Sequence, residues 1–328
     1  MFINKHMFIK IGEVGVYMRI LVLGAGVIGS YLTHSLLKAG QDVTILARGK
    51  RVKQLQMDGL VIKHFLQRKV TTDKINVIST LTEDDFYDLI FVVMKYNQFP
   101  SIYLDIAQNR SENIVFIGNN ANPTGMEKEI QKLSTITKNI GFGFNASGGI
   151  REDSGRVVST HGKGNIIFGE FNNNIPLQKR VKEAFGDHFK VTIEKDVEAW
   201  LLTHYIFIIP FVSLLYLHDF DAKNLSKSKV DLTMMIEATY EGFSILKDNG
   251  FNVTPSAQEK LLNHKRLYYV AMKLFLILPI NQMVSGGMDE IVALYDQFEK
   301  QKNESNLKTN NWDQIKKHTM KKYRNDIV

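Results

Sequence analysis

Six residues with glycine at the first, third and sixth positions stand between an apolar run and a helix-like stretch. They are Gly24, Ala25, Gly26, Val27, Ile28 and Gly29. The first glycine allows a tight turn, the second lets the backbone approach a pyrophosphate, and the third lets the helix pack closely on the strand. The helix N-terminus then offers free N–H donors and the positive end of its dipole to the phosphates. The pattern predicts a dinucleotide site, and the alternative is a glycine-rich turn without a ligand.

The elements around this turn are those that position a dinucleotide. An apolar run at residues 20–23 predicts a strand, residues 30–39 predict a helix, and residues 42–47 predict a second strand. Strand, glycine turn, helix and strand follow one another within about 30 residues, which is the setting in which the glycine pattern is informative.

The ribose end of such a site lies about 20 residues downstream, at the end of the second strand. An acid there would bind the 2′-hydroxyl of NAD, but this chain has Arg48, followed by Lys50 and Arg51. A guanidinium presents a fork of N–H donors that suits a 2′-phosphate. The basic residues therefore favour NADP over NAD, and the alternative is a solvated basic loop without a ligand.

Up to about residue 120, apolar runs alternate with helix-like stretches. Strands are predicted at 18–23, 42–47, 75–79, 88–94 and 113–117, and helices near 27–39, 49–57 and 98–109. This alternation predicts an α/β fold, a Rossmann-type doubly wound parallel sheet with helices on both faces. Residues 138–170 change character and predict antiparallel strands added at the edge of the sheet, with one more helix at 176–186.

From Val197 the pattern is helical almost to the end. We therefore expect an N-terminal extension at 1–17, an NADP-binding Rossmann domain at 18–190, and an all-helical domain at 191–328 for the substrate or for dimerisation. The extension has no long apolar stretch and no small-residue cleavage site, so it does not predict a signal peptide. It is an added strand, a loose leader or the result of a start codon assigned too early.

The composition excludes several functional classes. The chain of 328 residues contains no cysteine, which excludes disulfides, thiolate catalysis and cysteine–zinc sites and favours a reducing compartment, here the cytoplasm. The net charge of +7 is moderate, and no nucleic-acid motif accompanies it. Such a charge suits anionic substrates and cofactors. We expect a small-molecule substrate, no metal and no nucleic-acid partner, and we leave a homodimer open.

Residues 199–217 carry no formal charge and approach the length of a membrane span. They include Thr203, His204, Pro210 and Ser213. A lone span would split a nucleotide-binding fold, whereas a buried central helix of the second domain accounts for the same residues. We therefore predict a core helix and no membrane partner.

Four local patterns narrow the choice among dehydrogenase families. They are GAGVIG at 24–29 with LAR at 46–48, VVMKYNQ at 92–98, IGNN at 117–120, and HGKGNIIFGE at 161–170. Together they resemble the ketopantoate reductase family (2-dehydropantoate 2-reductases). The resemblance covers the chain from Met18, is specific through residue 170 and is looser after it.

In that family, the lysine after the fourth strand and the asparagine after the fifth line the nicotinamide and substrate pocket. The resemblance places them at Lys95 and Asn119. The positions of the two residues in the sequence support the same interpretation. Both follow neighbouring predicted parallel strands, and open α/β sheets bind ligands at the carboxyl ends of their strands. Otherwise Lys95 is an exposed loop lysine and Asn119 a turn residue.

The resemblance also implies a substrate-binding glutamate late in the chain. SGGMDEI at 285–291 is the best match and places it at Glu290, with the neighbouring Asp289 as the alternative. Two acids at the start of a helix are also favourable for the helix dipole alone. The family's substrate-binding serine has no convincing counterpart in this chain.

The main departure from the family lies on the first long C-terminal helix. The family has a catalytic lysine two residues after a tryptophan and an asparagine one turn later; the tryptophan is Trp200, and those positions are Leu202 and Ile206. Reduction of a ketone needs a proton at the developing alkoxide, and leucine supplies none. Tyr205 shares the face of Leu202 and is either a proton donor or a core aromatic. His204 points to the opposite side unless the register is shifted.

The sequence thus supports three functions. The first is an NADPH-dependent reductase of a small 2-oxo acid, in which Lys95 and Asn119 position the carbonyl and Glu290 binds a substrate hydroxyl. The second is an NADP(H)-binding sensor or regulator with little or no catalysis, which the aliphatic Leu202 and Ile206 motivate. The third is a related dehydrogenase whose pocket these two residues reshape for a larger or more apolar substrate.

Overall fold

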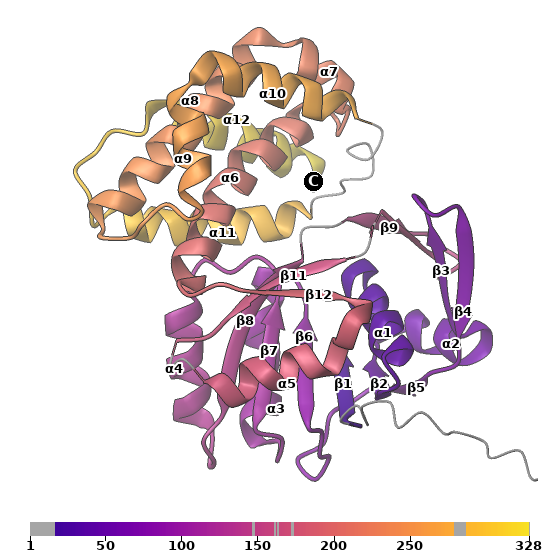
Figure 1. Ribbon diagram of the computed structural model, residues 1–328. Coiled ribbons are helices and arrows are strands. Elements are labelled where there is room, and N and C mark those ends of the chain that lie inside the picture. Colours follow the sequence, from indigo (N-terminus) through magenta and orange to yellow (C-terminus); the bar gives the residue numbers. More distant parts are fainter. Residues whose placement is uncertain are drawn as a thin grey trace, which may run out of the picture.

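A computed structural model describes residues 17–145, 148–160, 162, 164–171, 174–278 and 287–327. It shows an α/β part with a smaller second sheet at its side, and a helical part above it (Figure 1). The two parts follow one another in the chain, because the last strand ends at Ile193 and only helices follow it among the described residues. The predicted N-terminal extension lies outside the described residues except for Tyr17.

The main sheet has the strand order β12-β11-β8-β7-β6-β1-β2-β5. In chain order its strands are β1 (Arg19–Leu23), β2 (Asp42–Leu46), β5 (Asn76–Ile78), β6 (Leu89–Val93), β7 (Asn113–Ile117), β8 (Asn139–Asn145), β11 (Asn165–Gly169) and β12 (Lys190–Ile193). Every neighbouring pair from β5 across to β8 is parallel, while β11 is antiparallel to β8 and parallel to β12. The predicted Rossmann-type fold class is confirmed.

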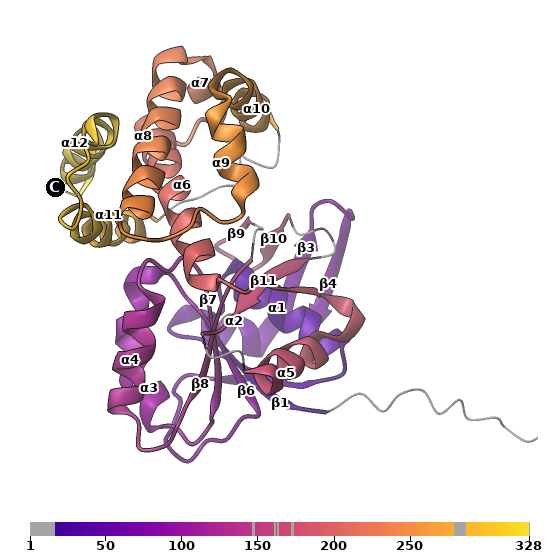
Figure 2. The ribbon, with the colours of Figure 1, turned by 60° about the vertical axis from the view of Figure 1, so that its left-hand side comes forward.

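Helices cover both faces of this sheet (Figure 2). They are α1 (Val27–Lys38), α2 (Lys50–Asp58), the 3-10 segment η1 (Tyr96–Ile102), α3 (Tyr103–Gln108), α4 (Pro123–Leu133), α5 (Ile175–Phe185) and the 3-10 segment η2 (Gly186–His188). Side chains alternate along β1. Ile20 and Val22 pack with residues of α1 and α5, whereas Leu21 and Leu23 pack with residues of α3 and α4. Because both faces are covered, the central strands are apolar throughout.

A second sheet has the strand order β4-β3-β10-β9 and packs beside α1. Its strands are β3 (Leu60–His64), β4 (Lys69–Asp73), β9 (Gly149–Arg151) and β10 (Val157–Ser159). The prediction that residues 138–170 add antiparallel strands to the edge of the main sheet is therefore correct only for β11. Strand β8 runs parallel to β7, and β10 leaves the main sheet to pair with β3. The reason is a long-range contact, because Ile62 and Val157 become buried together against α1, and no local pattern encodes that partner.

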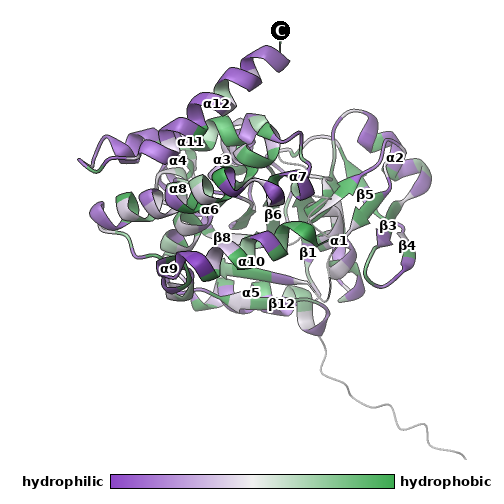
Figure 3. Ribbon diagram, turned by 90° about the horizontal axis from the view of Figure 1, so that it is seen from above, coloured by the Kyte–Doolittle hydropathy of each residue, from purple (hydrophilic) through white to green (hydrophobic). Residues whose placement is uncertain are grey.

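The C-terminal part consists of helices. They are α6 (Val197–Leu217), α7 (Ala222–Lys227), α8 (Lys229–Asp248), α9 (Ser256–Asn263), α10 (Lys265–Ile277), α11 (Met288–Lys302) and α12 (Asn310–Asp326). In the described part of the chain, α6 alone is long and apolar enough to cross a membrane, but most of it is buried and packs on α8, α11 and α12. It is thus the core helix of this part, and the outermost helix α12 is mostly hydrophilic (Figure 3).

Candidate functional site

The glycine turn joins β1 to α1 and imposes a different constraint at each glycine. Gly24 has a φ of +120°, and a Cβ there would lie 2.1 Å from the carbonyl oxygen of Val93. A Cβ at Gly29 would lie 1.9 Å from the carbonyl oxygen of Gly24. A Cβ at Gly26, by contrast, would meet no atom within 4 Å. The first and third glycines are thus needed for packing, and the second faces open space that fits a pyrophosphate.

Helix α1 begins directly behind this turn and presents its N-terminus to the same open space. Gly26 is the N-cap residue, and none of the described side chains caps the helix. Gly26 is exposed, while Val27 and Ile28 of the first turn are half-buried. Uncapped N–H groups and the positive end of the helix dipole suit a phosphate group. Residues 24–29 therefore form one continuous cradle that fits a dinucleotide.

Strand β2 ends beside this cradle and leads to the predicted ribose-binding residue. The N–H of Gly24 donates to the carbonyl oxygen of Leu46 at 3.1 Å, which ties the end of β2 to the turn. Arg48 follows two residues later, and its side chain is exposed. Arg51 is buried instead and donates to the carbonyl oxygen of Gly155 at 2.5 Å. Arg48 is therefore accessible to a 2′-phosphate, whereas Arg51 already has a structural partner.

Polar side chains from three elements meet at the carboxyl edge of the sheet. Lys95 follows β6, Asn119 follows β7, and Asp289 and Glu290 lie in the first turn of α11. Lys95 Nζ lies 2.9 Å from Asp289 Oδ1, and Asn119 Nδ2 donates to Glu290 Oε1 at 3.2 Å. The partners of these two contacts are 194 and 171 residues apart in the chain. The structure thus brings the three predicted catalytic residues Lys95, Asn119 and Glu290 into one cluster, with Asp289 beside them.

The start of η1 holds both acids of this cluster. The N–H of Tyr96 donates to Glu290 Oε1 at 3.0 Å, and Asn97 Nδ2 donates to Asp289 Oδ2 at 3.0 Å. Burial raises the pKa of Glu290, and its hydrogen bonds oppose this rise only in part. Burial also acts to raise the pKa of Asp289, but the hydrogen bonds from Lys95 and Asn97 outweigh it and lower that pKa. The cluster therefore holds one firmly ionised carboxylate and one that accepts a proton more readily.

Two residues of the cluster were not predicted as site residues. A Cβ at Gly287 would lie 1.9 Å from Lys95 Nζ and 2.4 Å from Asp289 Oδ1, so a larger residue there would require this ion pair to shift. Asn97 fixes the second oxygen of Asp289. The sequence could have indicated these two residues only by their proximity to the ion pair. Gly287 stands two residues before Asp289, and Asn97 stands two residues after Lys95. Outside the described residues lie 279–286, His161 and Lys163, which include parts of the predicted motifs.

Helix α6 presents apolar side chains where the resemblance implies a lysine and an asparagine. Leu202 and Ile206 are 1% and 0% exposed and belong to the core of the helical part. A Cβ at Gly242 of α8 would lie 2.5 Å from Ile206 Cγ2, so the two helices are in close contact. Tyr205 is buried on the same face and donates its hydroxyl to Gln301 Oε1. The hydroxyl proton of Tyr205 is therefore already engaged within the core.

The side of α6 that faces the sheet carries His204. Its ring stacks on that of Trp200, with 5.2 Å between centroids and an angle of 9° between planes, and its centroid lies 4.0 Å from that of Phe144 in β8. Its Nε2 is buried and has no hydrogen-bond partner within the described ranges. Burial lowers the pKa of His204 to about 4, so the ring is neutral near pH 7. A neutral, stacked ring is a packing residue and not a charged acid.

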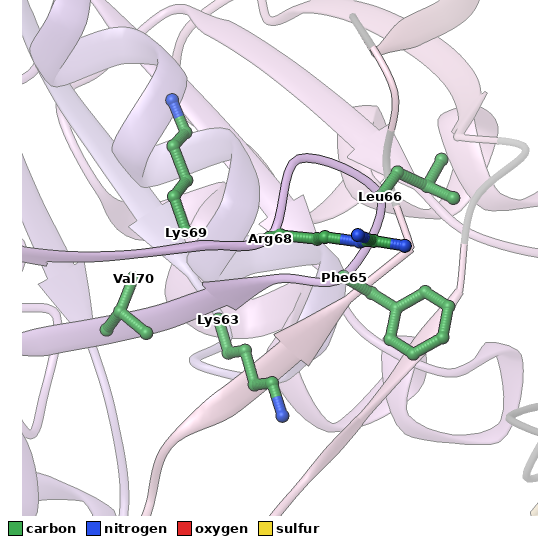
Figure 4. A pocket seen from close by; sticks show the side chains of 6 residues that line it. All are labelled: Lys63, Phe65, Leu66, Arg68, Lys69 and Val70. Carbon is green, nitrogen blue, oxygen red and sulfur yellow. The ribbon is translucent and has the colours of Figure 1, made fainter.

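Two hollows of the described structure differ in their position relative to the cluster. One of about 230 Å³ adjoins it between η1, α4 and α11, and is lined by Tyr96, Asn97, Pro100, Tyr103, Asn122, Met126, Glu129 and Ala293. The other, of about 440 Å³, lies on the β3–β4 hairpin and is lined by Lys63, Phe65, Leu66, Arg68, Lys69 and Val70 (Figure 4). The hairpin belongs to the second sheet and contributes no residue to the cluster or the glycine turn. Of the two, the smaller hollow therefore borders the candidate site, through Tyr96 and Asn97.

Comparisons with known proteins relate this chain to a family of reductases. Residues 20–173 match the family model of ketopantoate reductase PanE/ApbA. The 2-dehydropantoate 2-reductase of Pyrococcus horikoshii is 27% identical over 255 residues, which are 75% of this chain and 79% of the relative. The resemblance to the ketopantoate reductase family is confirmed.

Solved structures are similar to this chain over both its sheet part and its helical part. D-mandelate dehydrogenase with NADH and anilino(oxo)acetate has a TM-score of 0.78 at 16% identity, over 95% of this chain and 100% of that one. The 2-dehydropantoate 2-reductase from Geobacter metallireducens has a TM-score of 0.73 at 18% identity, over 90% of this chain and 97% of that one. The combination of a Rossmann-type sheet with these C-terminal helices is therefore shared.

Proposed function

We propose that this relative of the ketopantoate reductases is an NADPH-dependent reductase of a small 2-oxo acid, with 2-dehydropantoate or a related compound as its substrate. The observation that supports this most strongly is the meeting of Lys95, Asn119 and Glu290 beside a glycine turn that fits a dinucleotide. Open α/β sheets bind ligands at this edge. The relative from Pyrococcus horikoshii is named for that reaction, and D-mandelate dehydrogenase holds NADH. Both support a nicotinamide nucleotide as the cofactor.

Lys95 is the charged donor of the proposed mechanism. When bound, the nicotinamide cofactor supplies a hydride to the carbonyl carbon. The alkoxide oxygen that forms needs a positive hydrogen-bond donor and a proton. The Lys95 ammonium is the cation of the cluster, and its side chain is 42% exposed at the sheet edge, where a substrate can reach it. Asp289 holds the ammonium in place until the substrate oxygen takes up one of its hydrogen bonds.

Asn119 and Glu290 orient the bound molecules. Asn119 Nδ2 is engaged with Glu290, while Asn119 Oδ1 is buried and has no partner among the residues that the structure describes. A buried acceptor of this kind calls for a donor from a ligand, such as the carboxamide of the nicotinamide. Glu290 Oε1 accepts from Tyr96 and Asn119, and its carboxylate can accept from a substrate hydroxyl in addition.

Arg48 supports NADPH as the preferred cofactor. Its exposed guanidinium follows the end of β2, which the Gly24–Leu46 hydrogen bond fixes beside the phosphate cradle. A guanidinium binds a phosphate through two parallel hydrogen bonds, and it gains much less from the 2′-hydroxyl of NADH. We expect at least a tenfold preference for NADPH over NADH, which a fluorescence titration with each nucleotide measures.

A second function, nucleotide sensing without efficient catalysis, is supported by the buried apolar side chains of α6. Leu202 and Ile206 occupy the positions of the family's catalytic lysine and its neighbouring asparagine, and both are sealed in the core. The remaining cation, Lys95, is ion-paired with Asp289. A protein with these features binds the nucleotide in the same cradle but stabilises the alkoxide poorly.

A steady-state assay separates the two functions. NADPH oxidation is followed with ketopantoate and a panel of other 2-oxo acids. Turnover of about one per second or faster on one of them is the result expected for an enzyme. Tight NADPH binding without turnover on any carbonyl compound would establish the sensor instead. A folded protein that binds neither NADPH nor NADH would overturn both.

A further inference from the structure

Two arginines from different elements meet beside the N-terminus of α1. Arg151, the last residue of β9, donates from Nη1 to the carbonyl oxygen of Ala25 at 3.2 Å. Arg51 of α2 donates from Nη2 to Ser30 Oγ in the first turns of α1 at 3.3 Å. Ala25 stands between the first two glycines of the turn, so the Arg151 guanidinium lies at the phosphate cradle itself. The glycine motif contains neither arginine.

The backbone of β9 is built to hold this position. Gly149 has a φ of +151°, and a Cβ there would lie 2.1 Å from the carbonyl oxygen of Val158 and 3.0 Å from Val27 Cγ1. A side chain at Gly149 would therefore push β9 away from the first turn of α1. Figure 1 shows β9 above α1, on the same side as the helical part. The second sheet thus brings Arg151 to the backbone of the cradle.

These two positive charges have no acidic partner in the described contacts. The acids of the β9–β10 turn are engaged elsewhere, because Glu152 Oε2 accepts from Arg156 at 2.8 Å and Asp153 lies 3.8 Å from Lys50. Arg51 is 5% exposed, and its Nε is buried and has no partner in the described part of the chain.

Burial, and then the charge of Arg151, lower the pKa of Arg51 to about 10. Two neighbouring cations at the positive end of a helix dipole repel one another until an anion joins them.

We propose that Arg151 forms the outer wall of the pyrophosphate site, with its free N–H groups bonded to the diphosphate oxygens. Arg51 is a positioning residue, which holds the β9–β10 turn through Gly155 and adds a buried positive charge behind the cradle. This inference rests on the proposed nucleotide binding and adds a contact to it. The diphosphate is shared by NADPH and NADH, so Arg151 contributes to the affinity for both, whereas Arg48 contributes to that for NADPH only.

The experiment measures dissociation constants of NADPH and NADH for the wild type and three variants. Arg151→Met is expected to weaken both nucleotides by about tenfold or more, because a charge-assisted bond to an anion is lost. Arg48→Met is expected to weaken NADPH by a similar factor and to leave NADH within about twofold. Arg156→Met is the matched control, because this arginine lies in the turn between β9 and β10 and, among the described contacts, its side chain bonds to the half-buried Glu152 alone.

Inorganic pyrophosphate provides a readout that is independent of the nucleoside. It is expected to compete with NADPH on the wild type, and its inhibition constant should rise in Arg151→Met by about the same factor as the NADPH dissociation constant. Equal affinities of Arg151→Met and wild type for both nucleotides would overturn the inference. A loss confined to NADPH would also overturn it, by assigning Arg151 to the 2′-phosphate. If the wild type itself binds neither nucleotide, the proposed function fails first.

Discussion

The two sides of the candidate site differ in what maintains them. On the sheet side, the glycine turn is constrained by backbone contacts, since a single added carbon at Gly24 or Gly29 would collide with a carbonyl oxygen. On the helical side, the corresponding face of α6 is an ordinary apolar core that contains Leu202 and Ile206. A nucleotide cradle built from the backbone cannot change without damage to the fold. A single side chain on the face of a helix, by contrast, can be exchanged while the helix keeps its place.

The Lys95–Asp289 ion pair joins the two sides. Lys95 follows β6 of the sheet, whereas Asp289 opens α11 of the helical part. The pair is exposed enough to be worth little for stability, since such surface pairs contribute about 0–1 kcal/mol. The pair therefore serves to position the lysine more than to hold the two parts together.

The largest effect is expected from one methyl group at Gly29. Gly29→Ala places a Cβ 1.9 Å from the carbonyl oxygen of Gly24, so α1 must shift away from β1. We expect the free energy of unfolding to fall by about 4–5 kcal/mol, measured by urea denaturation.

Gly26→Ala is the matched control for this substitution, because its Cβ meets no atom within 4 Å and its φ of −75° is accessible to alanine. It should keep the stability within about 1 kcal/mol but weaken NADPH binding at least tenfold. If Gly26→Ala binds NADPH as tightly as the wild type, the turn is not the phosphate cradle.

The next largest effect is expected on the helical side. Leu202→Lys introduces an ammonium at a position that is 1% exposed, without an acid in the surrounding apolar cluster. We expect the free energy of unfolding to fall by about 3–4 kcal/mol because the charge is desolvated. Leu202→Met controls for shape and should cost less than about 1.5 kcal/mol. The same proteins are assayed for ketopantoate reduction. A tenfold rise in turnover for Leu202→Lys would contradict a sealed position and show that this residue faces the substrate.

The parallel sheet was predictable because its signals are local. Apolar runs such as residues 89–93 and 113–117 are buried on both faces, and the glycine spacing at 24–29 reports a backbone constraint that the structure confirms. The second sheet was not predictable in the same way. Strand β3 pairs with β10 across roughly a hundred residues, and each of these strands is short. A three-residue strand such as β10 carries too little pattern to indicate which sheet it joins.

The site residues likewise differ in whether the sequence alone could predict them. Lys95 and Asn119 could be predicted because the carboxyl ends of adjacent parallel strands lie together in any such sheet. Glu290 required the family resemblance, since nothing in its own segment indicates that α11 returns to the sheet edge. Arg151 was missed because its position depends on the pairing of β9 with β10 in the second sheet, whereas the sequence predicted strands of this region at the edge of the main sheet.

A smaller effect, on rate and not on stability, is expected at the junction. Lys95→Met removes the cation that we propose to stabilise the alkoxide, and we expect kcat to fall by about 100-fold, equivalent to about 2.7 kcal/mol. The NADPH dissociation constant should change by less than tenfold, because the phosphate cradle is untouched. Asp289→Asn keeps the lysine and loses only the charge that holds it, so a loss of about tenfold is expected. If Lys95→Met retains a third of the wild-type kcat, another group supplies the proton.

The smallest effect concerns the side of α6 that faces the sheet. His204 has its pKa lowered to about 4, while an unfolded histidine titrates near 6.5. Between these values the unfolded state binds more protons, so the free energy of unfolding falls as the pH falls from about 6.5 to 4. His204 accounts for about 2–3 kcal/mol of that loss at 1.36 kcal/mol per pKa unit. His64 has a pKa lowered to about 4 by burial and by neighbouring charges, and acts in the same direction.

The variant His204→Phe isolates the contribution of this one ring. Phenylalanine can keep the stack on Trp200 and Phe144 and needs no partner for a buried nitrogen. Urea denaturation at pH 7 and at pH 4.5 should therefore show a loss of stability that is smaller in His204→Phe than in the wild type by about 2 kcal/mol, with His64 responsible for part of what remains. An identical loss in both proteins would mean that His204 is already solvated in the folded state. In that case the sheet-facing side of α6 is open to water, and a histidine there would be free to act on a substrate.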